Sequence, residues 1–595
     1  MFNYGIGGQE MHKDASETLA DLPQNRTLII IGLTSEQPLK PEIVHGLKTT
    51  EEVFNYYHPQ LNVEFLNEDG STFTEVISFH SLSDFGLKGL FNQSNFLINL
   101  KNQVNEHAIV IKQLKTNRLL RACIENSLNK ESLFSALLAL VQEIECANNI
   151  ALKEKMNDLA QVLQDSIDKL AKLGGYDFLE SIIEGAGNLN PERKARKKIF
   201  LTESAYEQER EFLKIKLKHW AEMLKEIDDI SKFIETSLIK SDGANKLLNK
   251  NLLKVLNATR ELETTYKAVA LFFKNTESDK VKNVTFVNAG LDQLKDLDNL
   301  QFSNAIAEEL SQNIRRYDMR DNYSILIIPG YLGSDKALEK WGKIAHENKV
   351  MLITDFDNLD TPEDIFDEFE KANLTGEEIY RSNISMTCNW LIGRVGNLDV
   401  GENDDLYIPP STAFGGKLYI VIMSMVTAGK RHGGLNEVDG VKFDLKKSEI
   451  ANLEKLGLVT MVSEYGKVMA FSNRTLYNGD NLALQSFSVV RTFDYIIKVL
   501  IGFLHIRAFE NFTSKSENEF RNEIIKFLDG RIGPNRLIEQ FKILRFEPDP
   551  YQNFRFYLDI NMIPYFPAKS FVIKMDFQMS HDGNEVQWST EYTKG

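Results

Sequence analysis

The sequence predicts a chain of mixed α/β and α+β class, on three observations. Residues 324–355 contain two apolar strands with a helix between them, which is the spacing of a parallel βαβ unit. Residues 62–79 contain two strand-like runs around Asp69-Gly70, a pair that favours a hairpin turn. Long helical stretches accompany these strands, as in residues 206–239, where apolar side chains recur at spacings of three, four or seven.

Residues 1–146 are expected to form a compact α+β unit that ends in helices. A buried strand opens it, because the run after Arg26 is apolar and β-branched. A short helix then begins at Thr49, where Glu52 completes a capping-box pattern. After the hairpin the apolar period becomes helical, and the predicted helices cover 94–126 and 133–144.

Residues 147–200 are expected to be a linker helix and an arm. The stretch 147–172 is polar and strongly helical, and glycine pairs and Pro191 follow it. Residues 201–595 then form a second region, with a long amphipathic helix over 206–239 and another over 247–273.

The rest of this second region is expected to be an α/β core followed by C-terminal strands. Apolar runs predict its strands and helical periodicity predicts its helices. The expected strands are 284–288, 324–330, 350–355, 541–546, 554–561 and 570–577, and the expected helices are 335–347, 363–372, 487–510 and 517–528.

Composition and charge narrow the class of protein. The 595 residues include 69 Lys+Arg and 85 Asp+Glu, so the net charge is −16, which argues against general binding to nucleic acid or anionic membranes. The three cysteines form no metal-binding pattern and indicate a reducing compartment. The longest apolar stretch, 418–426, is about half a membrane span, and no signal peptide is recognised, so a cytoplasmic protein is expected.

The sequence shows no convincing active site. No phosphate-binding loop motif is present, and Ser334 lacks the flanking glycines of a nucleophile elbow, so it is interpreted as a helix N-cap. The acidic residues from Asp355 onward lack calcium-loop spacing and are interpreted as a solvated loop. We therefore expect no catalytic residue, cofactor or metal; the alternative is a cytosolic hydrolase or phosphotransferase using Ser334 and the loop at Asp355.

One dense basic patch, Glu192–Lys198, leaves two interpretations open. It could contact nucleic acid, but no aromatic stacking residues accompany it. A solvated or protein-contacting basic arm is favoured.

Longer stretches of the chain resemble a known family. In the first part they are residues 2–8, 22–27, 46–54, 79–85, 112–121 and 125–126. In the second part they are residues 190–198, 328–334, 381–390, 405–411, 435–440, 471–481, 530–534 and 565–570. On these stretches, residues 1–146 resemble the small subunit of the type VI secretion contractile sheath (TssB), and residues from about 149 to the end resemble its large subunit (TssC). In the family the two subunits are usually separate chains, so the joined sequence is interpreted as a fused gene, an engineered fusion or two polypeptides numbered as one chain.

The resemblance implies a mechanical protein with a phage-tail-sheath-like fold: mixed sheets, flanking helices, and extended terminal arms that share a sheet with neighbouring subunits. Sheath subunits similar to these stack as six-membered rings around an inner tube, attach to a baseplate, and contract to drive the tube toward a target cell. The partners implied are other copies of the chain, the inner-tube protein, the baseplate and a hexameric unfoldase that recycles contracted sheaths.

The resemblance also suggests which residues act between subunits. For strands that add to a neighbour's sheet, the candidates are Leu28, Ile29, Ile30 and Ile31 near the start, and Phe571, Val572, Ile573 and Met575 near the end. Ordinary strands within one chain are the alternative for both sets. The helix that an unfoldase would recognise corresponds to residues 159–173, with Leu159, Leu163, Ile167 and Leu170 on its apolar face.

Overall fold

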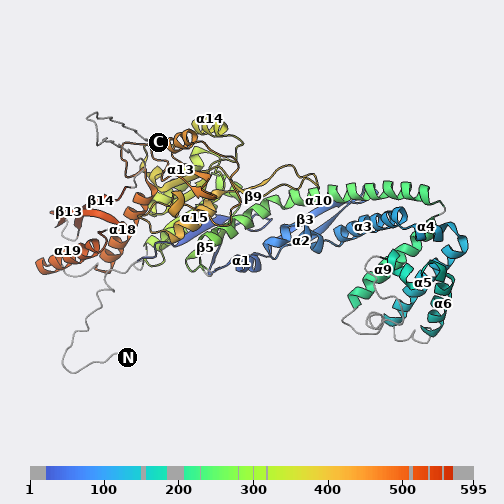
Figure 1. The fold of residues 1–595 in the computed structure, drawn as a ribbon. Coiled ribbons are helices and arrows are strands. Elements are labelled where there is room, and N and C mark those ends of the chain that lie inside the picture. Colours follow the sequence, from blue (N-terminus) through green and yellow to red (C-terminus); the bar gives the residue numbers. More distant parts are fainter. Residues whose placement is uncertain are drawn as a thin grey trace, which may run out of the picture.

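The chain folds into an α/β body that is joined by a long helical stem to a distant helical bundle (Figure 1). The computed structural model describes residues 22–148, 156–183, 207–227, 229–278, 281–298, 300–315, 319–507, 513–533, 536–551 and 555–566. The body holds the central sheet, and helix α10 runs from it to the bundle formed around α5, α6 and α9.

An eight-stranded sheet is the centre of the body. Its order is β12-β11-β8-β7-β6-β1-β5-β2, with parallel pairing from β11 through to β5 and an antiparallel strand at each edge. The strands are β1 (Thr27–Ile31), β2 (Glu42–His45), β5 (Val284–Asn288), β6 (Ile325–Ile328), β7 (Met351–Asp355), β8 (Ile384–Cys388), β11 (Leu458–Glu464) and β12 (Lys467–Ala470). The predicted βαβ unit is confirmed as β6, α13 and β7.

Strand β1 lies inside this sheet, between β5 and β6. Thr27 is in register with both Val284 and Ile325. All five residues of β1 are buried, as expected of a strand in a parallel sheet covered on both faces. Ile29 packs into the core on one face of the sheet and Ile30 into the core on the other.

This position corrects two expectations. Leu28, Ile29, Ile30 and Ile31 do not add to a neighbour's sheet, because both edges of β1 already pair with strands of the same chain. Residues 1–146 do not form a unit of their own either, since β1 and β2 lie in a sheet whose other strands come from residues 284–470.

Helices cover both faces of the sheet. One face is packed by Phe302, Trp341 and Phe369, from α12 (Leu300–Arg315), α13 (Asp335–Glu347) and α14 (Pro362–Ala372). The other face is packed by α15 (Pro410–Ile420), the second half of α10 and the start of α18 (Phe487–Ile506). Shorter elements of this part are α11 (Leu291–Lys295), η5 (Ile379–Asn383), β9 (Leu391–Arg394), β10 (Leu406–Ile408), α16 (Gly429–His432) and α17 (Lys447–Lys455).

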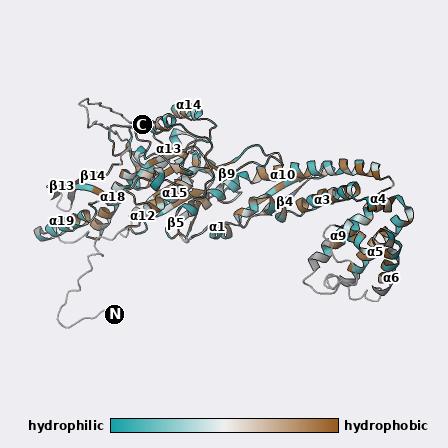
Figure 2. Ribbon diagram, in the orientation of Figure 1, coloured by the Kyte–Doolittle hydropathy of each residue, from teal (hydrophilic) through white to brown (hydrophobic). Residues whose placement is uncertain are grey.

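Helix α10 (Ile230–Asn275) forms the stem, and its start differs from the one predicted from the sequence. The predicted helix over 206–239 is divided: α9 ends at Glu226, and Asp229 caps α10 by accepting from the backbone N–H of Ser231 at 2.8 Å. From there α10 runs without a break through the region expected to separate two helices. Apolar and polar residues alternate along it, as in an amphipathic helix (Figure 2).

The hairpin predicted at residues 62–79 is confirmed as β3 (Gln60–Leu66) and β4 (Thr72–Ser78), which lie along the stem (Figure 1). Asn251 of α10 fixes it there, since its side-chain amide bonds to both the N–H and the C=O of Leu66, at 2.8 and 2.9 Å. Nearby elements are α1 (Thr50–Tyr57), η1 (Leu82–Phe85), α2 (Leu87–Gln93) and α3 (Asn95–Thr116).

The distant bundle includes the described part of the predicted linker. Helix α6 packs on α5, and the bundle shares one apolar core. Residues 156–183 therefore belong to a packed unit, while residues 184–200 lie outside the described residues. Its elements are α4 (Arg118–Glu125), α5 (Ser127–Asn148), α6 (Met156–Lys169), η3 (Ala171–Leu173), α7 (Tyr176–Ile182) and α9 (Glu207–Glu226).

The last described elements of the chain are α18, α19 (Ser514–Asp529) and a two-stranded sheet of β13 (Ile538–Pro548) and β14 (Phe556–Pro564). The strand expected over 570–577 lies outside the described residues.

Because β1 fills the gap between β5 and β6, we expect the two parts of the chain to depend on each other. When residues 1–148 and 149–595 are produced as separate chains in one cell, they should co-purify. Residues 149–595 alone should aggregate, because two strand edges and the apolar faces around them would be exposed. The measurement is solubility and size-exclusion chromatography, with the intact chain as control. A soluble, monomeric 149–595 piece would contradict the role given to β1.

Candidate strand-addition interface

The pair β13–β14, residues 538–564, stands apart from the central sheet, and we call it the terminal hairpin. Its strands are antiparallel, with Phe541 opposite Met562 and Lys542 opposite Asn561. Apart from a single bridge between Ile532 and Ile538, neither strand pairs with another strand in the part of the chain that the structure describes. Among the described residues, the outer edges of β13 and β14 therefore pair with no third strand beyond that bridge.

The two faces of the terminal hairpin differ. One face packs on helices α18 and α19, where Ile538 and Phe546 join an apolar core with Phe503 and Ile524. Apolar side chains of the hairpin that lie outside this core reach solvent: Leu544 is 61% exposed and Ile563 45%. Phe566, just after β14, is 55% exposed. An isolated two-stranded hairpin is marginally stable, so packing on the helices is what holds it.

Leu22, far away in sequence, packs beside this hairpin. Leu22, the first described residue, is buried in the core that the hairpin covers. Phe566, the last described residue, follows directly after β14. The predicted inter-subunit residues Phe571, Val572, Ile573 and Met575 lie outside the described residues, five or more positions beyond Phe566. Sequence analysis missed the exposed Leu544, Ile563 and Phe566, although it predicted strands over 541–546 and 554–561.

Asp355 was the centre of the alternative, catalytic interpretation, and its surroundings are those of a structural residue. It ends β7 and is fully buried, which corrects the expectation that it lies in a solvated loop. Its Oδ1 accepts from the hydroxyl of Thr387 and from the N–H of Ser411 at 2.8 Å. Its Oδ2 accepts from the N–H of Gly330 at 2.8 Å and from Oγ of Ser411 at 2.5 Å.

These four hydrogen bonds occupy both oxygens of the carboxylate, with two bonds to each. Burial raises the pKa of Asp355 to about 6, and the hydrogen bonds from Ser411, Thr387 and Gly330 oppose that rise. The carboxylate thus fastens the first turn of α15 to the ends of β6, β7 and β8. No lone pair is left to act as a general base.

Ser334 and the rest of the acidic loop support the same conclusion. Ser334 is the N-cap of α13, as predicted, and its Oγ accepts from the N–H of Ala337 at 3.2 Å. Asp357 and Asp360 are exposed, and Asp360 pairs with Lys442 at 2.6 Å. Among the described residues no group of three or more His, Cys, Asp or Glu side chains could hold a metal ion.

The residues proposed for an unfoldase lie in the distant bundle. Leu163, Ile167 and Leu170 are buried in its core, and Leu159 is half-buried. Since α5 covers this apolar face, a partner could reach it only if the bundle opened. The neighbouring Val162 is 47% exposed on the outer side of α6.

Three further features of the sequence are the basic patch, the cysteines and the apolar stretches. The basic patch Glu192–Lys198 lies outside the described residues. Cys123 and Cys388 are buried free thiols, and burial raises the pKa of each. None of the helices in the described ranges is long and apolar enough to cross a membrane.

Three family models match the chain. They are the TssC/VipB-like N-terminal region over residues 163–252, the type VI secretion system TssC/VipB central domain over 254–478, and the TssC/VipB-like C-terminal domain over 486–594. Together they cover well over half of the chain. The matches begin at residue 163, so they leave the resemblance of residues 1–146 to the small subunit untested.

Some solved structures of injection-system proteins are also similar to this chain. The helical sheath of the anti-feeding prophage in its contracted state is 16% identical, with a TM-score of 0.39, and the match covers 54% of this chain and 82% of that one. The contracted PVC sheath complex of an extracellular contractile injection system is 13% identical, with a TM-score of 0.38, over 54% and 81%. These TM-scores are too low to carry the assignment, which rests on the family models. No curated protein matches the chain.

Because the hydrogen bonds of Asp355 are structural, substitutions at this site should change the free energy of unfolding and no catalytic activity. Asp355→Asn replaces an acceptor oxygen with a donor that faces other donors, and should lower the free energy of unfolding by about 2–4 kcal/mol. Ser334→Ala removes only a helix cap and should cost about 1 kcal/mol. Denaturant unfolding of the purified variants measures both. Equal losses, or a hydrolytic activity that either substitution abolishes, would contradict the structural role.

Proposed function

The chain belongs to the TssC/VipB family and is a sheath subunit of a contractile injection system, and from that premise we propose that it assembles in the cytoplasm as stacked six-membered rings around an inner tube. Contraction of this sheath would drive the tube toward a target cell, and a baseplate would anchor one end. The observation that carries the assembly step is the terminal hairpin, which forms a sheet of only two strands among the described residues and exposes Leu544 and Ile563.

Strand addition at this hairpin gives the subunits a directional contact. A strand from a neighbouring copy would pair with a free edge, so that main-chain hydrogen bonds supply affinity and alternate side chains supply register. Phe571, Val572, Ile573 and Met575 are the proposed donors. They follow the hairpin closely in sequence.

Residues 1–146 fill the role of the small subunit in this proposal. The insertion of β1 between β5 and β6 supports it, since the first part of the chain completes the sheet of the second part. Two chains joined in this way would be inseparable after folding. Joining the two subunits in one chain therefore adds a covalent link between them and leaves the packing of β1 in the sheet unchanged.

The proposed sheath stores its energy in packing between subunits. No cofactor is turned over, and contraction is a change between two packed arrangements separated by a barrier. The alternative, a hydrolase or phosphotransferase using Ser334 and Asp355, is not favoured, because both side chains are engaged in structural hydrogen bonds.

Variants of the terminal hairpin test assembly directly. Leu544→Asp and Ile563→Asp place charges on its outer side, where a neighbour would bury them at a cost of several kcal/mol, so tubes should no longer form. Both positions are exposed in the single chain, so the melting temperature should stay within about 1–2 °C of the parent. Electron microscopy with the inner-tube protein present measures tube formation.

Val76→Asp is the matched control. Val76 is 54% exposed and lies on the β3–β4 hairpin, far from the proposed contact. Tubes that persist in the Leu544 and Ile563 variants but vanish in the Val76 variant would move the interface to β3–β4. Deletion of residues 567–595 tests the donor strand: a folded chain that no longer polymerises supports it, whereas an unfolded chain assigns the strand to its own subunit.

We also propose that a recycling hexameric unfoldase engages α6. The buried Leu163 and Ile167 would become available only when contraction loosens the bundle. Val162→Asp leaves the bundle core intact, and we expect weaker capture of contracted sheaths by the unfoldase with an unchanged melting temperature. Binding of extended and contracted sheaths in a sedimentation assay measures this. Equal capture of the parent and the variant would remove α6 from the recognition step.

A further inference from the structure

Three cations without ion-pair partners gather in a groove beside the end of helix α15, and we call it the basic groove. It has a volume of about 390 Å³ and is lined by Lys430 and Arg431 of α16 and by Lys467 of β12. All three residues are exposed, and none forms a salt bridge within the described residues. The acidic residue that lines the groove, Glu277, pairs with Lys417 at 2.5 Å. The groove therefore keeps a net positive charge.

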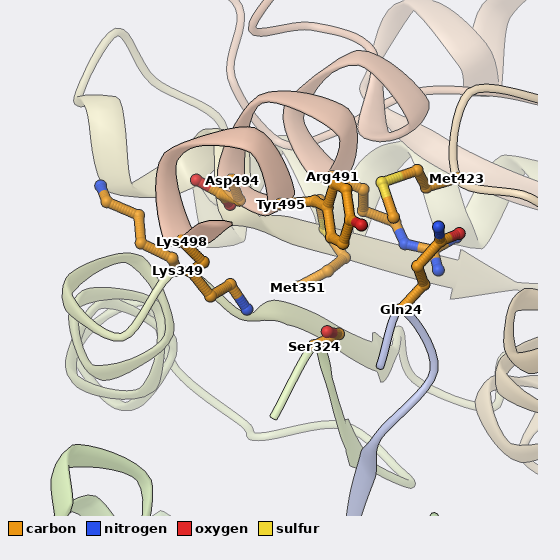
Figure 3. A pocket seen from close by; sticks show the side chains of 9 residues that line it. All are labelled: Gln24, Ser324, Lys349, Met351, Met423, Arg491, Asp494, Tyr495 and Lys498. Atoms are coloured by element: carbon orange, nitrogen blue, oxygen red, sulfur yellow. The ribbon is translucent and has the colours of Figure 1, made fainter. Parts of the chain in front are cut away.

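The basic groove is open to other molecules, unlike another group of cations in the body. Lys349, Arg491 and Lys498 line a small cavity beside α18 (Figure 3). That cavity has about 10 Å³ of space, which is room for about one water molecule. Lys498 already donates there to Oδ1 of Asn322 at 2.9 Å and to the backbone oxygen of Tyr323 at 2.7 Å. Side chains of another molecule can enter the groove but not this cavity.

Helix α14 carries acids that match the groove in number, and we call them the acidic stripe. Glu363, Asp367 and Glu370 are spaced by four and three residues, so they share one face of the helix. Ile365 and Phe369 bury the opposite face. All three acids are exposed, and none forms a salt bridge within the described ranges. Like charges at these spacings repel one another, so cations from elsewhere would stabilise the helix.

The acidic stripe and the basic groove lie on opposite faces of the central sheet. Phe369 of α14 packs into the core on one face, whereas Phe414 of α15 and Val468 of β12 pack into the core on the other. A chain therefore cannot place its own stripe in its own groove. Between two copies the same contact is possible, and it joins different surfaces of the two molecules. Contacts of this head-to-tail kind repeat, and they build a helical filament when the rotation does not close a ring.

We propose that the acidic stripe of one copy docks in the basic groove of the next copy, an inference that rests on the proposed sheath function. Three acids spread over about 10 Å of helix would meet three cations. Each copy carries a net charge of −16, so copies repel in general, and a local match of opposite charges offsets this at the contact.

The same surfaces add a smaller apolar contact. Ile420 and Ile422 line the groove and are 38% and 43% exposed. On α14 the half-buried Phe366 follows Glu363 by three residues, so it lies beside the stripe. A small anion would neutralise the cations of the groove but would leave these apolar side chains uncovered, which favours a second copy as the occupant.

Reversal of the charges tests the contact. The groove variant carries Lys430→Glu, Arg431→Glu and Lys467→Glu, and the stripe variant carries Glu363→Lys, Asp367→Lys and Glu370→Lys. All six positions are exposed, so the melting temperature should stay within about 1–2 °C of the parent. Each variant alone should self-associate at least about tenfold more weakly than the parent at low salt, because like charges then meet. Sedimentation velocity of the purified full chain measures this, and high salt should reduce the difference.

An equimolar mixture of the two variants identifies the partner. The groove variant keeps an acidic stripe that fits the unchanged groove of the stripe variant, and the reversed stripe fits the reversed groove. The mixture should therefore recover the tenfold loss. If the surfaces bind a different protein or a small anion, the mixture associates as weakly as the separate variants, and the proposal is wrong. It is also wrong if neither variant differs from the parent.

Lys240→Glu, Lys246→Glu and Lys250→Glu together form the matched control. These exposed lysines lie on the half of α10 nearer the bundle, and their reversal changes the net charge as much as the groove variant does. Association should equal that of the parent, and a loss as large as in the groove variant would overturn the contact. Gln at the six tested positions gives the same comparison with a smaller loss if a reversed variant unfolds.

Electron microscopy of the same samples separates this contact from the sheath function. Recovery of association in the mixture without tubes in any sample would support the contact and reject the sheath lattice. Tubes from both variants, with association equal to that of the parent, would reject the contact and keep the sheath.

Discussion

The structure depends on one constraint: β1 must lie between β5 and β6. The strand pairs with Val284–Asn288 on one side and Ile325–Ile327 on the other, and its side chains contribute to the cores on both faces of the sheet. Without it, the parallel sheet is interrupted at its middle and two edges open within the core. The helices that cover the sheet would then pack on a gap. The order of the sheet explains why a segment from the start of the chain is needed by elements more than 250 positions later.

Most local elements were predictable from the sequence, because their signals are local. The βαβ spacing at 324–355, the Asp69-Gly70 turn and the Ser334 cap all depend on neighbours within a few residues, and all three are confirmed. The partners of β1 were not predictable, since an all-apolar strand has no feature that selects one buried neighbour over another. The residues were recognised as a strand, yet their place in the sheet was wrong.

The candidate sites show the same limit. Asp355 was recognised at the end of a strand, but its burial follows from Thr387 and Ser411, which come from β8 and α15. The sequence likewise does not show that β13 and β14 form a sheet of only two strands in the described chain. A pattern predicts a strand, but whether the strand has a partner is decided by the whole fold.

Helix α10 joins the body and the distant bundle through one long helix. At 1.5 Å per residue its 46 residues span about 70 Å, and Asn251 and the Arg394–Glu263 pair tie it to the β3–β4 hairpin and to β9. A rigid arm of that length converts small rotations into large travel: a turn of about 10° at the body would move the far bundle by about 12 Å. Any such rotation displaces the central sheet far less than it displaces the bundle. The part of the chain that moves furthest would be the part that carries α6.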